Sequence, residues 1–471
     1  MAVWWIRRDL RLHDNPALAA ALERGRSVVP LFILDPALLS SPDASPGRTA
    51  FLFAGLRTLD QDLRARGGRL VVRRGRPHRV LAQVVRETGA EVIVAQADVS
   101  PYAQRRDARV AAHLPLQLVG GVTVVPPDRV TGPEGSPYRI FTPFRRAWEA
   151  AVATEHLAPI APPSRLAVPE TLATEEIPAS APGFEGFPPG EQAARKRLAA
   201  FAAGADAPIY RYAATRDRVD LDGTSRLSPY LRFGMVSARE VLAAAHRAMR
   251  LAPDASACQS VRVYIGELIW REFYAAILRH FPHVLEQEFR PALRGIRWND
   301  DPDGLAAWQA GLTGFPIVDA AMRQLARTGW IPNRARMIVA SFLVKDLLID
   351  WRHGERHFMR LLLDGDPAAN TGGWQWTAGV GTDAAPYFRT FNPTLQGRRT
   401  DPHGTYVRQW VPELARVPDQ YIHEPWTMPS ETQRAADCRI GRDYPAPLVD
   451  HAAARVRAQA RYQAARSVAR P

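Results

Sequence analysis

Cysteine is scarce in this sequence, which has two among 471 residues. Cys258 and Cys438 are far apart and have no metal-binding spacing, so a disulfide framework is not expected and we expect a cytoplasmic protein. Two thiols are also too few for an iron–sulfur cluster held by four cysteines. These shortages exclude a disulfide-stapled secreted fold and a four-cysteine cluster.

Long apolar runs are also missing. The apolar start at residues 2–6 is followed directly by charges and is too short for a signal peptide or a membrane span, and no later run is long enough to cross a bilayer. No G-x-G-x-x-G sequence follows the first expected strand, and no Walker sequence is present. We therefore expect no membrane partner, no NAD-type site and no P-loop.

Acidic residues are outnumbered by basic ones. The chain has 61 Lys and Arg against 48 Asp and Glu, which gives a net charge of +13 and an isoelectric point near 10.3. Such a balance favours an anionic partner, and nucleic acid is the first candidate. Because arginine far outnumbers lysine, an arginine-rich proteome is the alternative explanation.

The length and the 46% hydrophobic content allow two or three domains with real cores. Residues 1–130 alternate strand and helix patterns, which predicts an α/β domain with a doubly wound parallel sheet of the Rossmann type. Asn15-Pro16 has the cap and first-turn proline of a helix that stops near Gly25. The expected strands are Ala2–Ile6, Val28–Leu34, Leu70–Val72 and Glu91–Ala95.

Two further regions follow this domain. Residues 131–200 are rich in Pro, Gly, Ala and Glu, which predicts a long interdomain linker on the surface. Residues 201–471 have helical patterns almost throughout and predict an all-helical domain. Within it, Ser237-Ala-Arg-Glu240 has the sequence of a capping box, and Pro332 begins a helix expected to run to about Leu348.

The segment Asn370–Trp376 carries an unusual group of side chains. It places an amide, two glycines and two indoles shortly after Asp364-Gly365-Asp366, a mixture poorly suited to a core and well suited to the wall of a planar redox cofactor. Trp374 and Trp376 are two positions apart, about 200° on a helix, so one can face the interior and the other a pocket.

Two upstream helices present further groups on single faces. Glu267, Trp270 and Arg271 fall at i, i+3 and i+4, and Asn333 and Met337 fall at i and i+4. Taken alone, the first group is better explained as a surface Glu–Arg pair beside a tryptophan, and the second as a cap and a core residue. Their occurrence together, in one order, favours a functional site.

With residues 266–274 and 330–337, these motifs resemble the photolyase/cryptochrome family of flavoproteins over essentially the whole chain. Within that family the chain is most similar to bacterial class I cyclobutane pyrimidine dimer photolyases. The resemblance implies an antenna-chromophore α/β domain, an FAD-binding helical domain at 201–471, and light-driven electron transfer from fully reduced FAD to a dimer flipped out of ultraviolet-damaged DNA. We expect a monomer with no obligate protein partner.

The resemblance also implies the residues that hold the lesion. Glu267 would hydrogen-bond the dimer, Trp270 and Trp376 would wall the flipped bases, and Asn333 and Met337 would contact them. Enzymes of the (6-4) type place histidines where this chain has Asn333 and Met337, so the cyclobutane dimer is the preferred substrate. Arg216 and Arg334 match phosphate contacts, and Arg389, Arg398 and Arg399 are added on charge alone.

The flavin contacts and the electron route are implied in the same way. Thr224-Ser225-Arg226-Leu227-Ser228 matches the loop at the flavin pyrophosphate. Asn370 matches the residue that faces flavin N5, where plant cryptochromes carry aspartate, and therefore favours repair over signalling. Trp374, Trp351 and Trp308 match the tryptophans that carry electrons from the surface, although each alone would be a core residue. The other implied contacts are Tyr212, Tyr264, Glu267, Arg271, Gly365, Asp366 and an Arg336–Asp364 pair.

The antenna chromophore is assigned from the α/β domain. Folate-binding members use an Asn-Glu pair that is absent from residues 96–102. Residues 47–52 and the Pro101-Tyr102 turn are more similar to the deazaflavin-binding branch. We expect 8-hydroxy-5-deazaflavin, with methenyltetrahydrofolate, FMN or no antenna as alternatives.

Three other functions stay open at this point. A signalling cryptochrome is disfavoured by Asn370, by the pocket tryptophans and by the expected lack of a C-terminal extension. A DASH-type enzyme acting mainly on single-stranded DNA is disfavoured by Trp376. A basic DNA-binding protein with a vestigial flavin site is the third. No metal site is expected, because His353-Gly-Glu-Arg-His357 lacks a third ligand.

Overall fold

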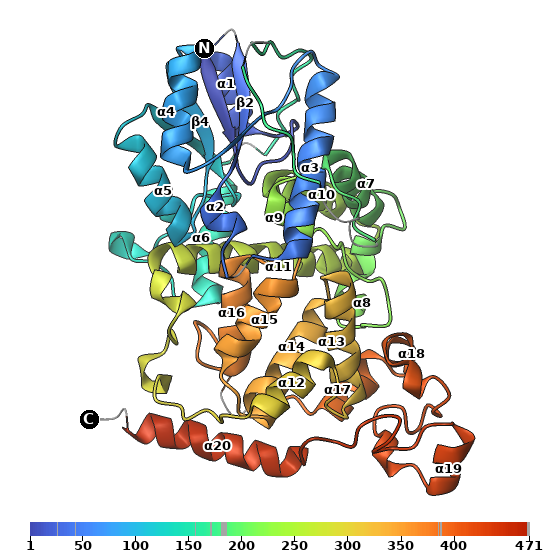
Figure 1. Ribbon diagram of the computed structural model, residues 1–471. Helices are drawn as coiled ribbons and strands as arrows, with labels where there is room; N and C mark the ends of the chain where they lie inside the picture. Colours follow the sequence, from blue (N-terminus) through green and yellow to red (C-terminus); the bar gives the residue numbers. More distant parts are fainter. Residues whose placement is uncertain are drawn as a thin grey trace. The chain divides into compact units, whose positions relative to one another are not determined.

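The computed structural model describes residues 1–25, 27–42, 44–155, 157–169, 172–179, 186–384, 386 and 389–468. The chain divides into two compact units. Unit 1 comprises Met1–Tyr210, Ser225–Pro282 and Leu363–Ala368, and unit 2 comprises Arg211–Thr224, His283–Leu362 and Ala369–Pro471. Helices and strands are labelled in Figure 1.

Unit 1 contains a parallel sheet in the order β3-β2-β1-β4-β5. The predicted α/β fold class is confirmed, and the four predicted strands are present with ends shifted by a few residues. The fifth strand was not predicted, because it is a half-exposed edge strand that ends in two glycines and lacks an apolar run. The strands are β1 (Ala2–Ile6), β2 (Val28–Leu34), β3 (Val71–Arg74), β4 (Val92–Ala97) and β5 (Leu116–Gly121).

The helices between these strands begin where the sequence indicated. Asn15 caps the first helix by accepting a hydrogen bond from the Leu18 amide, with proline at the first helical position. The helices α4 and α5 lie side by side on one flank of the sheet (Figure 1). Their bounds are α1 (Pro16–Arg24), α2 (Pro36–Leu39), α3 (Pro46–Arg64), α4 (Pro77–Thr88) and α5 (Pro101–Ala111).

The predicted linker at 131–200 is not wholly irregular. It contains α6 (Phe141–Val152) and most of the next helix, α7 (Glu191–Ala202). Both helices belong to unit 1, so the predicted boundaries at 130 and 200 do not coincide with the compact units. The expected capping box is present, because Ser237 Oγ accepts from the Glu240 amide at 2.8 Å. Unit 1 also contains α9 (Ser228–Phe233), α10 (Ala238–Arg250) and α11 (Ala255–His280).

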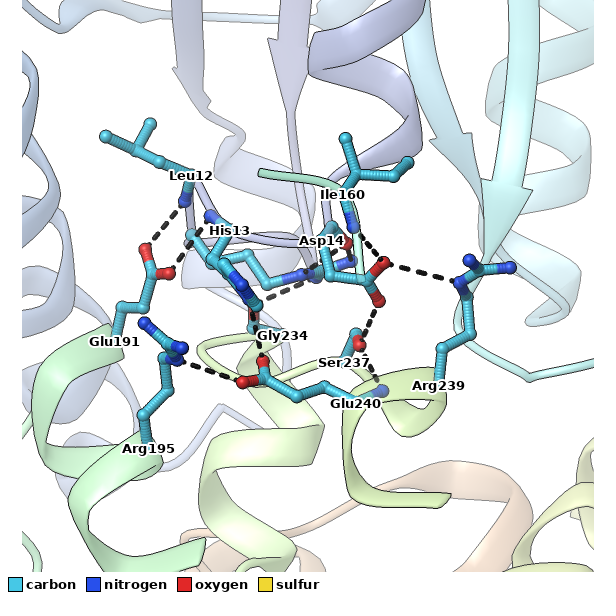
Figure 2. Close-up of polar contacts among 11 residues, drawn as sticks. Leu12, His13, Asp14, Ile160, Glu191, Arg195, Gly234, Ser237, Arg239 and Glu240 are labelled. Carbon is cyan, nitrogen blue, oxygen red and sulfur yellow. Dashed lines mark hydrogen bonds and ion pairs between the residues drawn. The ribbon is translucent and has the colours of Figure 1, made fainter. Parts of the chain in front are cut away.

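A buried polar network fixes the loop after β1 (Figure 2). Asp14 is fully buried at φ 48°, and its carboxylate accepts from Ser237 Oγ and from the Ile160 amide at 3.2 Å. The Arg239 guanidinium lies 3.5 Å from the same carboxylate. Arg11 Nη2 donates to the Asp14 carbonyl at 2.8 Å, and Arg11 Nη1 donates to the Gly234 carbonyl at 3.0 Å. The loop is therefore bound to α10 and to the turn before it.

A second part of the network reaches α7 (Figure 2). The Glu191 carboxylate accepts from the amides of Leu12 and His13 at 2.7 and 3.0 Å. The Glu240 carboxylate lies 3.2 Å from the His13 ring and 2.9 Å from Arg195 Nε. Helices far along the chain thus satisfy the backbone of the first loop.

Unit 2 is built from helices, as the sequence indicated. The helix that begins after Pro332 continues as a π-helical turn at residues 342–346. No helix in the described part of the chain is long and apolar enough to span a membrane. The helices are α8 (Tyr212–Thr215), α12 (Pro302–Ala310), α13 (Pro316–Thr328), α14 (Asn333–Ser341), η6 (Phe342–Asp346), α15 (Trp351–Leu361), α16 (Pro367–Ala378), α17 (Pro393–Thr400), α18 (Thr405–Trp410), α19 (Ser430–Ala435) and α20 (His451–Val468). The short 3-10 turns of both units are η1 (Pro127–Arg129), η2 (Pro133–Gly135), η3 (Pro208–Arg211), η4 (Pro282–Leu285), η5 (Pro291–Leu293), η7 (Pro412–Leu414) and η8 (Pro425–Thr427).

The core of unit 2 contains a buried lysine. Lys345 lies in η6, is 1% exposed, and donates from Nζ to the Ala378 carbonyl at 3.1 Å. Its Nζ is 3.8 Å from the centre of the Tyr462 ring, and the Tyr462 hydroxyl donates to the same carbonyl at 2.7 Å. Burial lowers the pKa of Lys345 to about 7, because charge is disfavoured away from water.

The pH dependence of stability tests this burial. Above the unfolded pKa of about 10.4 the lysine is neutral in both states, and its titration does not reduce the free energy of unfolding. As the pH falls, protons favour the unfolded state, and the loss of stability is complete below the folded pKa of about 7. We expect Lys345→Met to raise the free energy of unfolding at neutral pH by about 1–3 kcal/mol, with the gain shrinking towards about pH 10. Urea unfolding of both proteins measures the difference. A gain that is independent of pH would contradict the lowered pKa.

Candidate functional site

The predicted site residues are divided between the two units. Each unit contributes part of the expected flavin contacts and part of the expected lesion contacts. Unit 1 holds Ser225, Arg226, Leu227, Ser228, Tyr264, Glu267, Trp270, Arg271, Asp364, Gly365 and Asp366. Unit 2 holds Tyr212, Arg216, Thr224, Trp308, Asn333, Arg334, Arg336, Met337, Trp351, Asn370, Trp374 and Trp376.

The loop at 225–228 has the backbone of an anion site. Arg226 has a positive φ of 49°, and Leu227 follows with a right-handed helical conformation. Successive residues of opposite hand turn their amides towards one point and form a nest that binds anions. The Tyr264 hydroxyl donates to Ser225 Oγ at 3.3 Å, and burial raises the pKa of Tyr264 to about 12. With the Arg226 side chain, this loop has the donors that a pyrophosphate requires.

The acidic segment is fixed within unit 1 by two arginines. Arg8 Nη2 lies 2.7 Å from Asp366 Oδ2, and Arg232 Nε donates to the Gly365 carbonyl at 2.7 Å. Asp366 Oδ1 also accepts from the Ala368 amide at 3.0 Å, in the first turn of α16. Burial alone would raise the pKa of Asp98, but Arg8, 3.5 Å away, holds it well below its usual range. Arg8 is thus paired with both Asp98 and Asp366, and all three side chains are partly buried.

Helix α11 carries the three residues predicted to share a face. Trp270 stacks on Phe141 with ring centres 3.7 Å apart and planes 2° from parallel, which covers one face of the indole. Arg271 Nη1 lies 3.4 Å from the Glu272 carboxylate, which also accepts from the amides of residues 124 and 125. Burial raises the pKa of Glu272 to about 7. Glu267 is half-buried on the same helix.

In unit 2, Asn370 is oriented by a residue that the sequence did not single out. Asn370 Nδ2 donates to Glu355 Oε1 at 2.8 Å and to the Glu355 carbonyl at 3.0 Å. The amide nitrogen is therefore committed, and the amide oxygen is left as the acceptor for another group. Thr371 Oγ1 donates to the same carboxylate at 3.2 Å. Glu355 lies between His353 and His357, a pair whose spacing indicates only a metal motif in the sequence.

The two indoles of α16 face opposite ways, as their spacing predicted. Trp374 is 2% exposed, whereas Trp376 is half-buried. Trp374 packs so closely on α15 that a Cβ at Gly354 would lie 2.1 Å from its ring. The residues Gly354 and Glu355 thus fix a tryptophan and an amide of the same helix.

Trp308 does not have the surface position that the resemblance implied. Its ring is fully buried, lies 6.0 Å from Trp374, and donates its N–H to the Val339 carbonyl at 3.0 Å. A residue without exposed surface cannot take electrons directly from a donor in water. Trp298 is half-buried at the edge of the same core and packs edge-on against Tyr462 with ring centres 6.1 Å apart.

Unit 2 carries the arginines predicted to bind phosphates, together with Asn333 and Met337. Asn333 is exposed, and its Nδ2 lies 3.7 Å from the Met337 sulfur. Arg334 Nη2 lies 2.6 Å from Asp217, and Arg216 Nε lies 3.8 Å from it. The guanidiniums of Arg334 and Arg389 both lie 5.8 Å from the Phe391 ring. Arg398 and Arg399 are exposed on α17, where Arg398 is paired with Glu424.

Other predicted flavin contacts have local partners within their own unit. Tyr212 is 7% exposed, and the Arg216 guanidinium lies 5.5 Å from its ring. Arg336 Nε donates to the Ile331 carbonyl at 3.0 Å. Asp364 is buried in unit 1. The pairing of Arg336 with Asp364 stays a prediction, as does the contact assigned to Thr224.

A second polar cluster lies at the carboxyl edge of the sheet, where the strand order reverses between β1 and β4. Open α/β sheets bind ligands at such a point. Arg7 follows β1, and its guanidinium donates to Asp107 Oδ1 at 2.6 Å and to the Gln96 carbonyl. The guanidiniums of Arg7 and Arg106 lie 4.7 and 4.9 Å from the centre of the Trp5 ring.

Three buried atoms of this cluster lack a hydrogen-bond partner within the described residues. They are Arg7 Nε, Gln96 Oε1 and Arg106 Nη2. Unpartnered buried polar groups are costly, so this edge suits a ligand with negative charge and both kinds of hydrogen-bonding group. Tyr102, from the predicted turn, donates its hydroxyl to Asp35 at the end of β2.

Comparison with known proteins decides the family. The model of the DNA photolyase family matches residues 2–164, and the model of the FAD binding domain of DNA photolyase matches residues 264–464. A deoxyribodipyrimidine photo-lyase of Streptomyces griseus is 43% identical over 97% of this chain and 98% of its own. The chain belongs to the DNA photolyase family.

Solved structures of this photolyase family are also similar. A bacterial class III photolyase from Agrobacterium tumefaciens matches with a TM-score of 0.90 and 37% identity over 99% of this chain and 98% of its own. A cryptochrome of Synechocystis matches with a TM-score of 0.89 and 30% identity over 98% of both chains. The predicted family and the predicted photo-lyase activity are confirmed: this family member is an FAD-dependent photo-lyase.

The Glu355–Asn370 contact generates one test. Glu355→Ala removes the carboxylate and leaves the backbone carbonyl of residue 355 as the remaining acceptor for the amide nitrogen, so the orientation of the Asn370 amide and its oxygen is held by one hydrogen bond instead of two. We expect bound, reduced FAD in this variant to reoxidise in air at least about tenfold faster, since a charge-assisted hydrogen bond contributes about 1.5–3 kcal/mol. Recovery of the oxidised flavin absorbance measures the rate. Glu431→Ala, at an exposed position, is the control, and equal rates in both would refute the assignment.

Proposed function

We propose that this enzyme repairs cyclobutane pyrimidine dimers in DNA by light-driven electron transfer from reduced FAD. The observation that carries the proposal is the fixed amide of Asn370, whose oxygen can accept from a protonated flavin N5. A neutral acceptor at that position suits a fully reduced flavin. The photo-lyase relatives at about 40% identity support the same reaction.

The lesion would be held by groups from α11 and α14. Glu267 would accept hydrogen bonds from the flipped bases, and the uncovered face of Trp270 would stack on one of them, with Phe141 supporting the other face. Asn333 and Met337, adjacent on α14, would contact the dimer. Neither is a histidine able to deliver a proton, which supports the cyclobutane dimer over the (6-4) product. Arg334 and Arg389 would bind the flanking phosphates.

The chain's own residues would hold the flavin and leave the chemistry to it. The nest at 225–228 would bind the pyrophosphate, with Tyr264 supporting the loop through Ser225. Asp366, already bound to Arg8, would keep the acidic segment in place. FAD supplies the excited-state electron and takes it back, so the repair cycle is redox-neutral.

A signalling photoreceptor is the second candidate function. The similarity to a cryptochrome at 30% identity favours it, because that protein shares the fold over the whole chain. Asn370 and the half-buried Trp376 support repair instead. A preference for single-stranded DNA, as in DASH-type proteins, would appear as faster repair of dimers in a single strand than of the same dimers in a duplex.

Photoreduction of the flavin would use tryptophans of unit 2. We propose Trp374 and Trp351 as the inner members, because both are buried. Trp298 takes the surface end in place of Trp308, because it is the more exposed and packs on Tyr462. Indoles suit this task, since their rings pack closely and their one-electron oxidation is accessible.

The sheet edge would hold the antenna chromophore. The guanidiniums of Arg7 and Arg106 and the amide oxygen of Gln96 match an anionic, planar heterocycle with donors and acceptors, such as 8-hydroxy-5-deazaflavin. FMN has similar ring chemistry and is the closest alternative. Methenyltetrahydrofolate is disfavoured by the missing Asn-Glu pair.

A repair assay tests the function. Chemically reduced enzyme would be mixed with oligothymidine that contains cyclobutane dimers, and recovery of thymine absorbance would be followed in blue light and in darkness. We expect recovery in light only, and a loss of at least about tenfold in yield for Glu267→Ala, from the hydrogen bonds to the lesion. Glu149→Ala on the exposed side of α6 is the control. Light-independent recovery, or none with a bound flavin, would refute repair.

Reconstitution tests the antenna. Stripped protein would be incubated separately with 8-hydroxy-5-deazaflavin, FMN and methenyltetrahydrofolate, and binding followed by chromophore fluorescence. We expect the deazaflavin to bind most tightly, and Arg7→Met to weaken it at least about tenfold, because a charge-assisted contact is lost. FAD content should be unchanged in that variant. Preferential binding of the folate would overturn the assignment.

A further inference from the structure

The indole of Trp351 donates its N–H to a buried carboxylate. The distance from Trp351 Nε1 to Glu288 Oε1 is 3.2 Å, and the two residues are 0% and 3% exposed. The other oxygen, Glu288 Oε2, lies 2.9 Å from Arg352 Nη2. Trp351 is predicted to carry a transient positive charge, and the indole N–H, which becomes most acidic in that state, faces the negative carboxylate of Glu288. Neither the motifs nor the family roles described above include Glu288.

The carboxylate is held in place from two helices. Gln375, 2% exposed on α16, accepts from the Phe289 amide at 2.9 Å and donates to the Gln287 carbonyl at 2.9 Å. The residues on both sides of Glu288 are thus bound to one side chain. From α15, Arg352 Nε donates to the Glu286 carbonyl at 2.7 Å. The position of Glu288 is consequently fixed before any charge appears on the indole.

One guanidinium and two carboxylates beside Trp351 leave a net charge of −1, which a positive charge on the indole would neutralise. The Arg352 guanidinium lies 4.8 Å from the centre of the Trp351 ring and would oppose a positive charge there. Arg352 is itself paired with Asp350 at 3.0 Å and with Glu288. Removal of the Glu288 charge would leave Arg352 paired with Asp350 alone, and the net negative charge beside the ring would be lost. In a water-poor site the loss of one charge acts strongly on a neighbouring group.

We infer that Glu288 tunes the electron route by stabilising one-electron-oxidised Trp351. This rests on the proposed route through Trp374 and Trp351. With oxidised FAD bound and excited by light, Trp374 would give up one electron, and Trp351 would then give one electron to Trp374. No bond breaks, and the indole proton remains on nitrogen in the hydrogen bond to Glu288. The positive charge is finally neutralised by one electron from an external thiol reductant, through the surface end of the route.

Glu288 acts here as a positioning residue, because it touches Trp351 and not the flavin. The carboxylate lowers the energy of the charge-separated state and slows return of the electron to Trp351. A purely structural glutamate would instead be replaced without loss by glutamine, which has the same shape and can still accept the indole N–H. The two roles differ only in the charge of one side chain, and that difference is measurable.

The test compares Glu288→Gln with Glu288→Ala, wild type and Trp351→Phe, all with oxidised FAD bound and a thiol present. Transient absorption follows the tryptophan radical, and steady illumination follows flavin photoreduction. We expect the radical in Glu288→Gln to decay about tenfold faster and photoreduction to slow in proportion, close to the level of Glu288→Ala. Glu286→Gln, an exposed change in the same loop, is the matched control and should behave as wild type.

The controls separate the two hypotheses. If Trp351→Phe photoreduces as fast as wild type, the proposed route is wrong. If Trp351→Phe is inactive and Glu288→Gln equals wild type, the route stands and the role of Glu288 is overturned. A readout without flavin is also available, since the ultraviolet resonance Raman spectrum of stripped protein reports the indole N–H bond. The Trp351 contribution, isolated by subtracting Trp351→Phe, should show a weaker hydrogen bond in Glu288→Gln, and an unchanged one would refute the contact.

Discussion

The ion pair between Arg8 and Asp366 is the interaction on which the rest of the candidate site depends. Its partners are 358 positions apart, one just after the first strand and the other in a short segment that belongs to unit 1. Arg232 holds the carbonyl of Gly365 in the same segment. Because α16 begins at Pro367, these contacts fix the start of the helix that carries Asn370 and the two indoles. Arg8 and Asp366 are partly buried, and each is the counterion of the other.

Much of the architecture could be predicted from local sequence. The Asn15 cap, the capping box at Ser237 and the strand patterns depend on neighbours within a few residues, and the structure has all three. The opposite directions of Trp374 and Trp376 follow from helix geometry alone. The flavin loop was identified by resemblance, and its nest conformation supplies the physical reason that a pyrophosphate would bind there.

The contacts that tune the site could not be predicted in this way. Glu355 and Glu288 meet their partners, Asn370 and Trp351, across separate helices and loops, and nothing in their own sequence windows distinguishes them from solvated acids. The same limit explains the error at Trp308, where a tryptophan in a family-like position proved to be fully buried. Exposure depends on the whole fold, whereas a motif reports only the residue type.

The network around Asp14 bears on how such a protein could exchange parts during evolution. Residues 2–164, which match one family model, look like a unit that recombination could transfer, yet polar groups of the first loop inside it are satisfied by Glu191, Ser237 and Glu240, which lie beyond it. A gene fragment that ended with the block would encode the buried carboxylate of Asp14 without Ser237 and Arg239, and the buried guanidinium of Arg11 without the Gly234 carbonyl. Inheritance of the α/β half is therefore coupled to inheritance of α7 and α10, and a viable crossover has to fall after both.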